Sequence, residues 1–485
     1  MNQHHQILVI GAGPGGYIAA LRAAAMGADT AIIEKHHLGG TCLNYGCIPS
    51  KALLSSAELL HHVQHAGEWG IEIAPGSIGH NWAAIQKKKD KTLRQLRGGI
   101  GALLKARAVT HYQGTAKFDG PGLVTVTPEK GEAYQVTADK VIIAVGSSPI
   151  RIPGWPDDPQ VVATSDESVH WNELPKKLLI VGGGVIGCEF ACMMQPFGVE
   201  VTIVEMLDEL LGVMDADLGA ELRKTLTKRG ITSLVGTKVE SMSLGGSGAL
   251  VQLSDGQTLD VDKVLVCIGR KPNTKDIGLD AAGVQTNKRG FIEVNDFMET
   301  TQPGHYCIGD ANGQCLLAHA ASAHGICAVE NALGHRHAFD HVIPSAVYTF
   351  PEIGAVGMTE AEARETGDPI AIGRFSIATL GKAMATNHAY GFVKTIRNRT
   401  TGKLLGVHMI GHNATECIAA AGAMLDQNVN VNDLAETVFA HPTIGEAIKE
   451  SAEDAMGYGL HQPPKKVMKI VAEAAPIAAA RNAAI

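Results

Sequence analysis

The chain has 485 residues, of which 45% are hydrophobic and 19% charged, and its formal net charge is −8. This length predicts about three domains of ordinary size, and the acidic balance argues against a nucleic-acid-binding protein, which would need a basic surface. We expect a cytoplasmic protein, because no apolar run suits a membrane helix, the first strand leaves no room for a targeting peptide, and nine cysteines do not suit a secreted disulfide framework.

A nucleotide-binding pattern opens the chain, where an apolar strand leads into a glycine-rich loop at residues 11–16 and then into a helix of small residues. Gly11 would form the tight turn, Gly13 would let the backbone approach a pyrophosphate, and Gly16 would let helix and strand pack closely. Glu34 ends the second strand, 23 residues after Gly11 (34 minus 11). This spacing suits a carboxylate that binds an adenosine ribose.

Cys42 and Cys47 follow, in a segment that cannot be a regular helix if the two thiols are to pair. Five helical residues advance about 7.5 Å, more than the Cα separation of about 4.4–6.8 Å that a disulfide tolerates. We expect Asn44 and Gly46 to supply the backbone freedom and a helix to begin near Ser50. A thiolate near that helix start would be stabilised by the helix dipole. The pair is therefore predicted to be redox-active, with two unrelated core thiols as the alternative.

The helices after the cysteines carry basic clusters. A long helix is predicted over residues 82–105, and its lysine run at 87–89 is expected to form a solvated face. His61, His62 and His65 on the preceding helix are likewise expected to be solvated, with metal binding as a minor alternative.

The nucleotide pattern recurs at residues 182–187, after a second apolar strand. It repeats the glycines at 182, 184 and 187, and Glu205 again follows the first glycine by 23 residues (205 minus 182). Two such sites with a dithiol between them predict two cofactors that exchange electrons, FAD in the first loop and a nicotinamide in the second; two α/β domains without ligands are the alternative. Glu205 would repel a 2′-phosphate, and none of the five residues after it is arginine, so NAD is favoured over NADP.

The helix of this second pattern is predicted over residues 189–197. Cys188, directly before this range, and Cys192, within it, are four residues apart. Because no further ligand lies nearby in the sequence, we expect both cysteines to be small core residues, and we expect no metal site.

Two later segments carry chemistry of their own. Asp310 ends a short strand and could bind a sugar-like hydroxyl chain, although a helix cap is the simpler interpretation. Antiparallel strands, the first at 348–356, then indicate a third kind of region without a glycine pattern. There, His441 could exchange protons near neutral pH, and Glu446 could orient it through one ring nitrogen. With 21 histidines in the chain, a structural or solvated histidine is the alternative.

Together these motifs resemble the pyridine nucleotide disulfide oxidoreductase family, class I, and within it the members that oxidise dihydrolipoyl groups. The resemblance covers about residues 6–460 and adds the segments 269–273 and 348–352 to the motifs above. It implies an α/β fold with two Rossmann-like dinucleotide-binding domains, for FAD and NAD, and a C-terminal α+β dimerisation domain. The implied domains are 1–150 (FAD, first part), 151–271 (NAD), 272–342 (FAD-binding central region), 343–460 (interface) and 461–485 (an Ala-rich tail of unknown role).

The resemblance also implies roles for individual residues. Cys42 would be the interchange thiol that the substrate attacks, and Cys47 the charge-transfer thiol against the flavin. His441, supported by Glu446, would take the substrate proton, and Lys51, paired with Glu189, would lie near the reactive flavin nitrogen. Asp310 would bind the ribityl chain. The implied cofactor-binding residues are Gly11, Gly13, Gly16, Glu34, Lys51, Gly146, Gly182, Gly184, Gly187, Glu205, Gly269 and Asp310.

The implied substrates are dihydrolipoyl groups on acyltransferase or glycine-cleavage carrier proteins, oxidised by a homodimer in which His441 serves the other subunit. No nucleic-acid or membrane partner is expected. The alternatives are a glutathione- or mercury-type reductase of the same family, or a flavoprotein with mainly an assembly role. The last cysteine is Cys417, so the cysteine pair expected near the end of a mercuric reductase is missing, and Val185 stands where a glutathione reductase usually has tyrosine.

Overall fold

The computed structural model describes residues 3–246 and 248–463, which fall into two compact units. The first unit runs to Ile343 and includes Val347–Phe350, and the second consists of Pro344–Ala346 and the chain from Pro351 onward. From residue 464 onward, the Ala-rich tail expected from the sequence lies outside the described residues. None of the helices in the described part of the chain has both the length and the apolar character that a membrane span requires.

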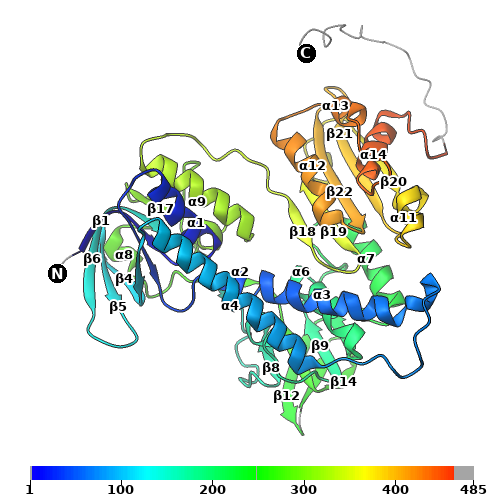
Figure 1. Cartoon of the computed structure of the whole chain (residues 1–485), viewed down its shortest axis with the longest axis horizontal. Helices are drawn as coiled ribbons and strands as arrows, with labels where there is room; N and C mark the ends of the chain where they lie inside the picture. The colour runs from blue at the N-terminus through cyan, green and yellow to red at the C-terminus, as the bar shows by residue number, and fades with distance from the viewer. Residues whose placement is uncertain (1–2, 247, 464–485) are drawn as a thin grey trace. The chain divides into compact units, whose positions relative to one another are not determined.

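The first unit contains a seven-stranded sheet (Figure 1). Its order is β3-β2-β1-β6-β5-β4, and β17 also pairs with β6. Strands β1, β2, β3, β6 and β17 are parallel, whereas β4 and β5 continue from β6 as an antiparallel meander. The strands are β1 (Gln3–Ile10), β2 (Thr30–Glu34), β3 (Thr110–Gln113), β4 (Thr115–Gly120), β5 (Leu123–Thr127), β6 (Tyr134–Ile143) and β17 (His305–Cys307).

Continuous apolar runs explain why this sheet is buried on both faces, as parallel sheets usually are. Along β1, Leu8 and Ile10 contribute to one core cluster, and Ile7 and Val9 contribute to the cluster on the other face. The helices of this part are α1 (Pro14–Ala25), α2 (Gly40–Asn44), α3 (Cys47–Gln64), η1 (Ala66–Trp69), α4 (Trp82–Ala106), α8 (Leu279–Ala282), η3 (Gly309–Asn312) and α9 (Ala318–Ala332).

A second, five-stranded sheet in the same unit is entirely parallel, in the order β11-β10-β9-β15-β8. An antiparallel sheet of β12, β13 and β14 packs its apolar side chains into the same core. The strands are β8 (Val162–Thr164), β9 (Lys177–Val181), β10 (Glu200–Val204), β11 (Thr232–Leu234), β12 (Val239–Gly245), β13 (Gly248–Leu253), β14 (Thr258–Val261) and β15 (Lys263–Val266). The helices are α5 (Ser165–Ser168), α6 (Val185–Met194), η2 (Gln195–Phe197) and α7 (Ala216–Lys228).

Two short antiparallel strands, β7 (Ser147–Pro149) and β16 (Arg270–Pro272), join the chain segments that enter and leave this second sheet. The predicted start of the second nucleotide helix at Glu189 was wrong, because α6 begins at Val185, directly after Gly184 and within the glycine pattern. A turn-to-helix junction without a side-chain cap carries no sequence signal other than the glycines themselves.

The second unit is built on a five-stranded sheet in the order β18-β19-β22-β21-β20. The first strand was expected over 348–356, but β19 begins only at Glu352, and β20 was not predicted. The strands are β18 (Ser345–Val347), β19 (Glu352–Gly357), β20 (Ile370–Ser376), β21 (Phe392–Asn398) and β22 (Leu404–Gly411). The helices are α10 (Glu360–Glu365), η4 (Ile377–Thr379), α11 (Gly381–Ala385), α12 (Ala414–Asp426), α13 (Val431–Glu436) and α14 (Glu446–Met456).

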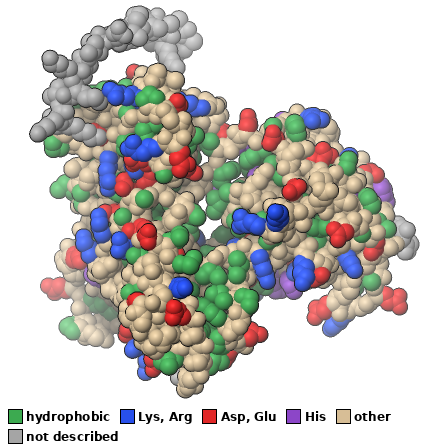
Figure 2. Space-filling model, turned by 180° about the vertical axis from the view of Figure 1, so that it is seen from behind, with side chains coloured by type: hydrophobic (Ala, Val, Ile, Leu, Met, Phe, Trp, Pro, Cys, Tyr) green, Lys and Arg blue, Asp and Glu red, His purple; other side chains and the backbone are tan. Residues whose placement is uncertain are grey.

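Charged side chains of both signs are interspersed on the face of the molecule in Figure 2.

The lysine run of α4 was expected to be solvated throughout, and this expectation is correct for Lys87 and Lys88 but wrong for Lys89. The Lys89 side chain is 1% exposed. A charge this deeply buried requires polar partners.

Candidate functional site: two nucleotide loops and a dithiol

The two glycine loops have the same local geometry. Gly11 and Gly182 adopt φ angles of +99° and +110°, which side chains rarely tolerate. A Cβ on Gly16 would lie 1.9 Å from the carbonyl oxygen of Gly11, and a Cβ on Gly187 would lie 2.0 Å from that of Gly182. Each loop therefore requires glycine at its first and last position, so that the helix can start directly against the strand.

The middle glycines differ from these, because the space beside them is open. A Cβ on Gly184 would have no neighbouring heavy atom within 4 Å, and one on Gly13 would meet only the Cα of Gly40, at 3.9 Å. Helices α1 and α6 start next to these glycines without a side-chain cap, so their first N–H groups are available to an anion. Both loops thus fit the pyrophosphate of a dinucleotide.

An acid at the end of each second strand, Glu34 within β2 and Glu205 directly after β10, reaches back to the loop. The Glu34 carboxylate accepts hydrogen bonds from the backbone N–H groups of Ala12 and His36, both at 2.8 Å. Glu205 does the same with Gly183 at 2.6 Å and with the backbone N–H of Leu207 at 2.8 Å. Each carboxylate keeps further lone pairs for the hydroxyls of a ribose, so both loops fit an adenosine ribose beside the pyrophosphate.

The dithiol segment packs against the first of these loops. The N–H of Gly39 donates to the carbonyl of Ala12 at 2.8 Å, and a Cβ on Gly40 would lie 2.5 Å from the Cα of Gly13. Helix α2, which carries Cys42, therefore starts in direct contact with the loop that fits the first nucleotide.

The helix that follows begins at Cys47, three residues before the predicted start at Ser50. The helical conformation is interrupted between α2 and α3, at Tyr45 and Gly46, as the spacing of the two thiols requires. Asn44 does not contribute flexibility: it is buried, and its side-chain amide donates to the carbonyls of Gly40 and Leu38 at 2.8 and 3.1 Å.

Both cysteines are free thiols in the structure, and they interact with each other. The hydrogen bond from Cys42 lowers the pKa of Cys47 to about 7, with help from the nearby Lys51 and against the opposing effect of burial. The same hydrogen bond, together with burial, raises the pKa of Cys42. Within the pair, Cys47 at the start of α3 is thus the thiol that ionises more readily, and Cys42 donates the hydrogen bond to it.

Lys51 and Glu189 form an ion pair beside Cys47, with distances of 3.0 and 2.9 Å from Nζ to the two carboxylate oxygens. The backbone N–H of Tyr348 also donates to Glu189, at 3.0 Å, and the Lys51 ammonium lies 4.2 Å from the centre of the Tyr348 ring. These contacts fix a charged side chain of α3 next to the helix of the second glycine loop.

Asp310 lies at the junction of the two nucleotide modules. Its carboxylate accepts a hydrogen bond from Ser147 and lies 3.8 Å from the Arg270 guanidinium. Gly146 and Gly269, with φ angles of +66° and +128°, flank the strands β7 and β16 that carry these partners. The Asp310 side chain is 24% exposed, so it can accept hydrogen bonds from a further ligand.

His441 and Glu446 lie together in the second unit. The Nδ1 atom of His441 is 2.9 Å from Oε1 of Glu446, and the other carboxylate oxygen accepts from the backbone N–H of Thr443 at 2.8 Å. Burial acts to raise the pKa of Glu446, but the hydrogen bonds from Thr443 and His441 outweigh it and lower that pKa. With Nδ1 held in this way, Nε2 is the ring nitrogen that can exchange a proton; the His441 side chain is 79% exposed.

A polar network that the sequence analysis did not predict contacts the end of α2, between the two cysteines. The buried Lys89 ammonium donates to the carbonyl of Val169 and to Nδ1 of His170, both at 2.9 Å. His170 in turn places Nε2 3.1 Å from the carbonyl of Asn44. Because Nδ1 accepts from an ammonium, Nε2 carries the proton and donates to Asn44. Only Lys89 gave a signal in the sequence, and it was misread as part of a solvated run.

The sequence matches the pyridine nucleotide-disulphide oxidoreductase family over residues 5–325 and the dimerisation domain of that family over residues 343–452. A dihydrolipoyl dehydrogenase of Bacillus subtilis is 39% identical over 95% of this chain and 100% of its own length. One from Haloferax volcanii is 39% identical over 94% of this chain and 97% of its own length.

Solved structures agree with the sequence relatives. LpdA from Mycobacterium tuberculosis superposes with a TM-score of 0.87 at 28% identity, over 93% of this chain and 99% of its own. The flavoprotein disulfide reductase RclA from Escherichia coli gives 0.84 at 27% identity, over 93% of this chain and 99% of its own. The predicted fold class and family are confirmed: the chain belongs to the pyridine nucleotide-disulphide oxidoreductase family.

Proposed function

We propose that this chain is an FAD-dependent dithiol–disulfide oxidoreductase that oxidises dihydrolipoyl groups and delivers the electrons to NAD⁺. The observation that carries the proposal is the dithiol itself: Cys47 starts helix α3, its pKa is lowered to about 7, and its segment abuts the first glycine loop. Relatives at 37–39% identity over nearly the whole chain are named dihydrolipoyl dehydrogenase, which supports dihydrolipoyl groups over glutathione or mercury as the substrate.

The cofactors follow from the two loops. FAD is assigned to the loop in contact with the dithiol, with 1–150 and 272–342 as its domain, and NAD to the loop at 182–187, with 151–271 as its domain. When bound, the two cofactors together supply a two-electron path from the dithiol to the nicotinamide. Glu205 supports NAD over NADP, because its carboxylate would repel a 2′-phosphate.

In the reaction that we propose, the enzyme starts with Cys42 and Cys47 joined as a disulfide. A dihydrolipoyl thiolate attacks the Cys42 sulfur, which forms a mixed disulfide and releases Cys47 as a thiolate. The second substrate thiolate then attacks its own half of the mixed disulfide, so that the lipoyl disulfide closes and Cys42 leaves. The substrate has lost two electrons and the cysteine pair has gained them. The low pKa of Cys47 makes it the better leaving group of the pair.

His441 is proposed as the base of this exchange, because only thiolates attack disulfides. Each substrate thiol passes its proton to Nε2, while Glu446 holds Nδ1 and stabilises the imidazolium that forms. Glu446 is a positioning residue in this scheme. We propose that His441 serves the dithiol of a second copy of the chain, since it lies in the region that matches the dimerisation domain of the family.

The proposed substrates are protein-bound dihydrolipoyl groups on acyltransferase or glycine-cleavage carrier proteins, and the proposed assembly is a homodimer with 343–460 as its interface. A cytoplasmic location remains a prediction from cysteine usage.

The test is a comparison of electron donors with the purified holoenzyme under anaerobic conditions. Dihydrolipoamide with NAD⁺ should give steady turnover. In the reductive direction, glutathione disulfide or Hg(II) with NADPH should give almost none. Cys42→Ser should abolish dihydrolipoamide oxidation, whereas Cys417→Ser, at another partly buried thiol, should leave it intact. Full activity of Cys42→Ser, or a preference for glutathione disulfide or Hg(II), would refute the proposal.

A further inference from the structure

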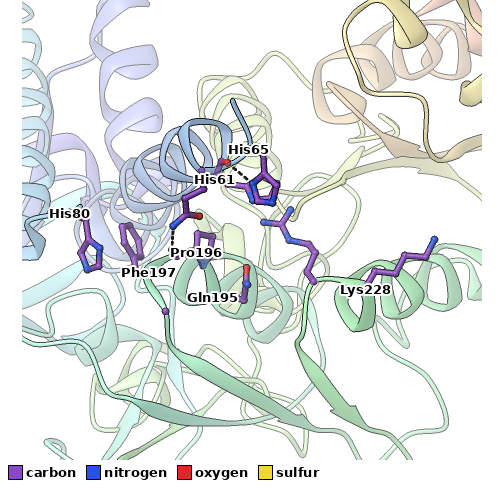
Figure 3. A pocket seen from close by; sticks show the side chains of 10 residues that line it. His61, His65, His80, Gln195, Pro196, Phe197 and Lys228 are labelled. Atoms are coloured by element: carbon purple, nitrogen blue, oxygen red, sulfur yellow. Dashed lines mark hydrogen bonds between the residues drawn. The ribbon is translucent and has the colours of Figure 1, made fainter. Parts of the chain in front are cut away.

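A cavity of about 510 Å³ lies in the first unit, away from the residues of the dithiol site. It is bordered by the end of α3, the segment before α4, helix η2 and the end of α7. Figure 3 shows His80 and Phe197 together on one side of the cavity and Lys228 on the other. Its lining also includes Arg229, His61 and His65, and contains no carboxylate.

Arg229 is the feature of this cavity that lacks an explanation within the protein. Its guanidinium lies over the Phe350 ring, 5.3 Å from the ring centre. A stacked guanidinium keeps its N–H groups directed outward in its own plane. Here Nε and Nη2 are buried, yet neither has a hydrogen-bond partner among the described residues. Buried charged donors without partners are costly, so these atoms indicate a missing acceptor.

The pKa of His61 is affected by the positive charge of Arg229. His61 is half-buried, and burial, followed by the charges of Arg229, His65 and His62, lowers its pKa to about 4. It is therefore wrong that all three histidines of α3 form a solvated face; this description fits only His62 and His65. The positive charges of Arg229 and Lys228 make the cavity unfavourable for a further cation and favourable for an anion.

We propose that this cavity binds a small organic phosphate, whose phosphoryl group pairs with Arg229 and whose carbon skeleton lies along Pro196 and Phe197. The guanidinium edge offers the paired N–H donors that suit a phosphoryl oxygen pair. Lys228 adds a second positive charge, and the opposite end carries aromatic rings, since Phe197 meets His80 and Trp82 edge-on at 5.2 and 5.3 Å. The volume exceeds what inorganic phosphate would fill and lies in the range of small-molecule sites.

The site also makes binding dependent on pH. The groups that face His61 are His62 and His65 on its own helix, His80 before α4, and Lys228 and Arg229 at the end of α7; Glu58 pairs with His62 at 3.9 Å. A bound anion offsets these positive charges and raises the pKa of His61. Binding should then take up a proton and strengthen as the pH falls toward the pKa of His61 in the complex.

The first experiment titrates phenyl phosphate into the holoenzyme by calorimetry, with NAD⁺ saturating so that the nucleotide loops are occupied. The wild type should bind one phenyl phosphate per chain. Arg229→Gln should weaken binding about tenfold or more, because a charge-assisted pair is lost. Lys224→Gln is the matched control: Lys224 is an exposed cation of the same helix, and its removal should leave the affinity unchanged. An equal effect of both variants, or no binding by the wild type, would overturn the proposal.

The second experiment uses benzenesulfonate, whose charge does not change across the pH range. Its affinity for the wild type should rise between pH of about 8 and about 6, with net proton uptake measured in buffers of different ionisation enthalpy. His61→Gln should remove the proton uptake. Persistence of the same uptake in His61→Gln would show that another group titrates and would refute this part of the proposal. Turnover of dihydrolipoamide plays no part in either readout, so the two proposals fail independently.

Discussion

Lys51 Nζ lies 3.0 and 2.9 Å from the two carboxylate oxygens of Glu189, and this ion pair stands beside Cys47. The two partners act on the thiol in opposite directions: Lys51 lowers the pKa of Cys47, and Glu189 raises it. The ion pair also connects α3 to the helix of the second glycine loop. One contact thus joins the two nucleotide modules and sets the acidity of the thiol between them.

Lys51→Met should raise the pKa of Cys47 from about 7 toward the ordinary thiol value of about 8.5, because the cation is lost and the Glu189 charge is left unbalanced. Glu189→Gln should lower it further. The pH dependence of Cys47 alkylation in the reduced protein, read by peptide mass spectrometry, measures both shifts. Glu209→Gln, which breaks the ion pair between Glu209 and Arg223 of α7, should not change the pKa of Cys47. Changes of the same sign in Lys51→Met and Glu189→Gln would contradict the assigned roles.

The hydrogen bond from Cys42 is the largest cause of the low pKa of Cys47. Cys42→Ala removes the donor and should raise that pKa, whereas Cys42→Ser keeps a hydroxyl donor and should raise it less. A thiol is charged at pH values above its pKa. The wild-type Cys47 thiolate therefore persists down to about pH 7 and is lost below it. The same alkylation profile distinguishes the variants, and identical profiles for Ala and Ser would exclude the hydrogen bond as the cause.

Glu205 should decide which nicotinamide is used. Its carboxylate accepts from Gly183 and Leu207, and a glutamine there would set an NH₂ group against one of these N–H donors. Glu205→Gln should therefore raise KM for NAD⁺ about tenfold and, with the repulsion removed, improve NADP⁺ relative to NAD⁺. The control is Glu200→Gln, at an exposed position of strand β10, which ends directly before Glu205. An unchanged NAD⁺/NADP⁺ ratio of kcat/KM would remove Glu205 from the specificity argument.

Lys89 should matter for stability although it belongs to a lysine run. Lys89→Met leaves the carbonyl of Val169 and the ring of His170 without their donor, at a cost of about 1–3 kcal/mol. The exposed neighbour Lys88, changed to Met, is the matched control and should cost almost nothing. Chemical denaturation of the holoenzyme measures both. Because His170 holds the carbonyl of Asn44 between the two cysteines, the pKa of Cys47 should shift in Lys89→Met as well. A lysine that served stability alone would not affect this pKa.

The sequence predicted the features that depend on near neighbours in the chain. The glycine loops and the acid at the end of each second strand were predicted at their positions, because turn, strand and carboxylate lie within one βαβ unit. The start of α3 was predicted three residues too late, because the sequence shows that the segment between the two cysteines must be distorted but not where the distortion ends; α3 begins at Cys47, directly after Gly46.

Features that depend on distant partners could not be predicted. Lys89 is buried with two acceptors, the carbonyl of Val169 and the ring of His170, that lie 80 and 81 residues further along the chain, and the pattern of a lysine run does not reveal them. Strand β20 was missed because Gly373 interrupts its apolar pattern; the structure requires glycine there, since a Cβ would lie 1.9 Å from the carbonyl oxygen of Ser451 on α14. The cavity at Arg229 is assembled from four separate segments and has no sequence signal.

The pair of His441 and Glu446 gives the sharpest test of the proposed base. His441→Gln removes the proton acceptor and should lower kcat for dihydrolipoamide about 10²–10⁴-fold, the usual contribution of general base catalysis.

Glu446→Gln keeps an oxygen for Nδ1 but presents an NH₂ group to the backbone N–H of Thr443. The imidazole should then lose its orientation and the charge that stabilises its protonated form, so kcat should fall by a smaller factor. The lower edge of the pH profile of kcat should also move to lower pH, because the protonated imidazole loses the carboxylate that stabilises it. Glu416→Gln, at an exposed position of α12 in the same unit, should change neither quantity. If Glu446→Gln lowered kcat without moving the pH profile, Glu446 would serve the fold of the segment rather than the base.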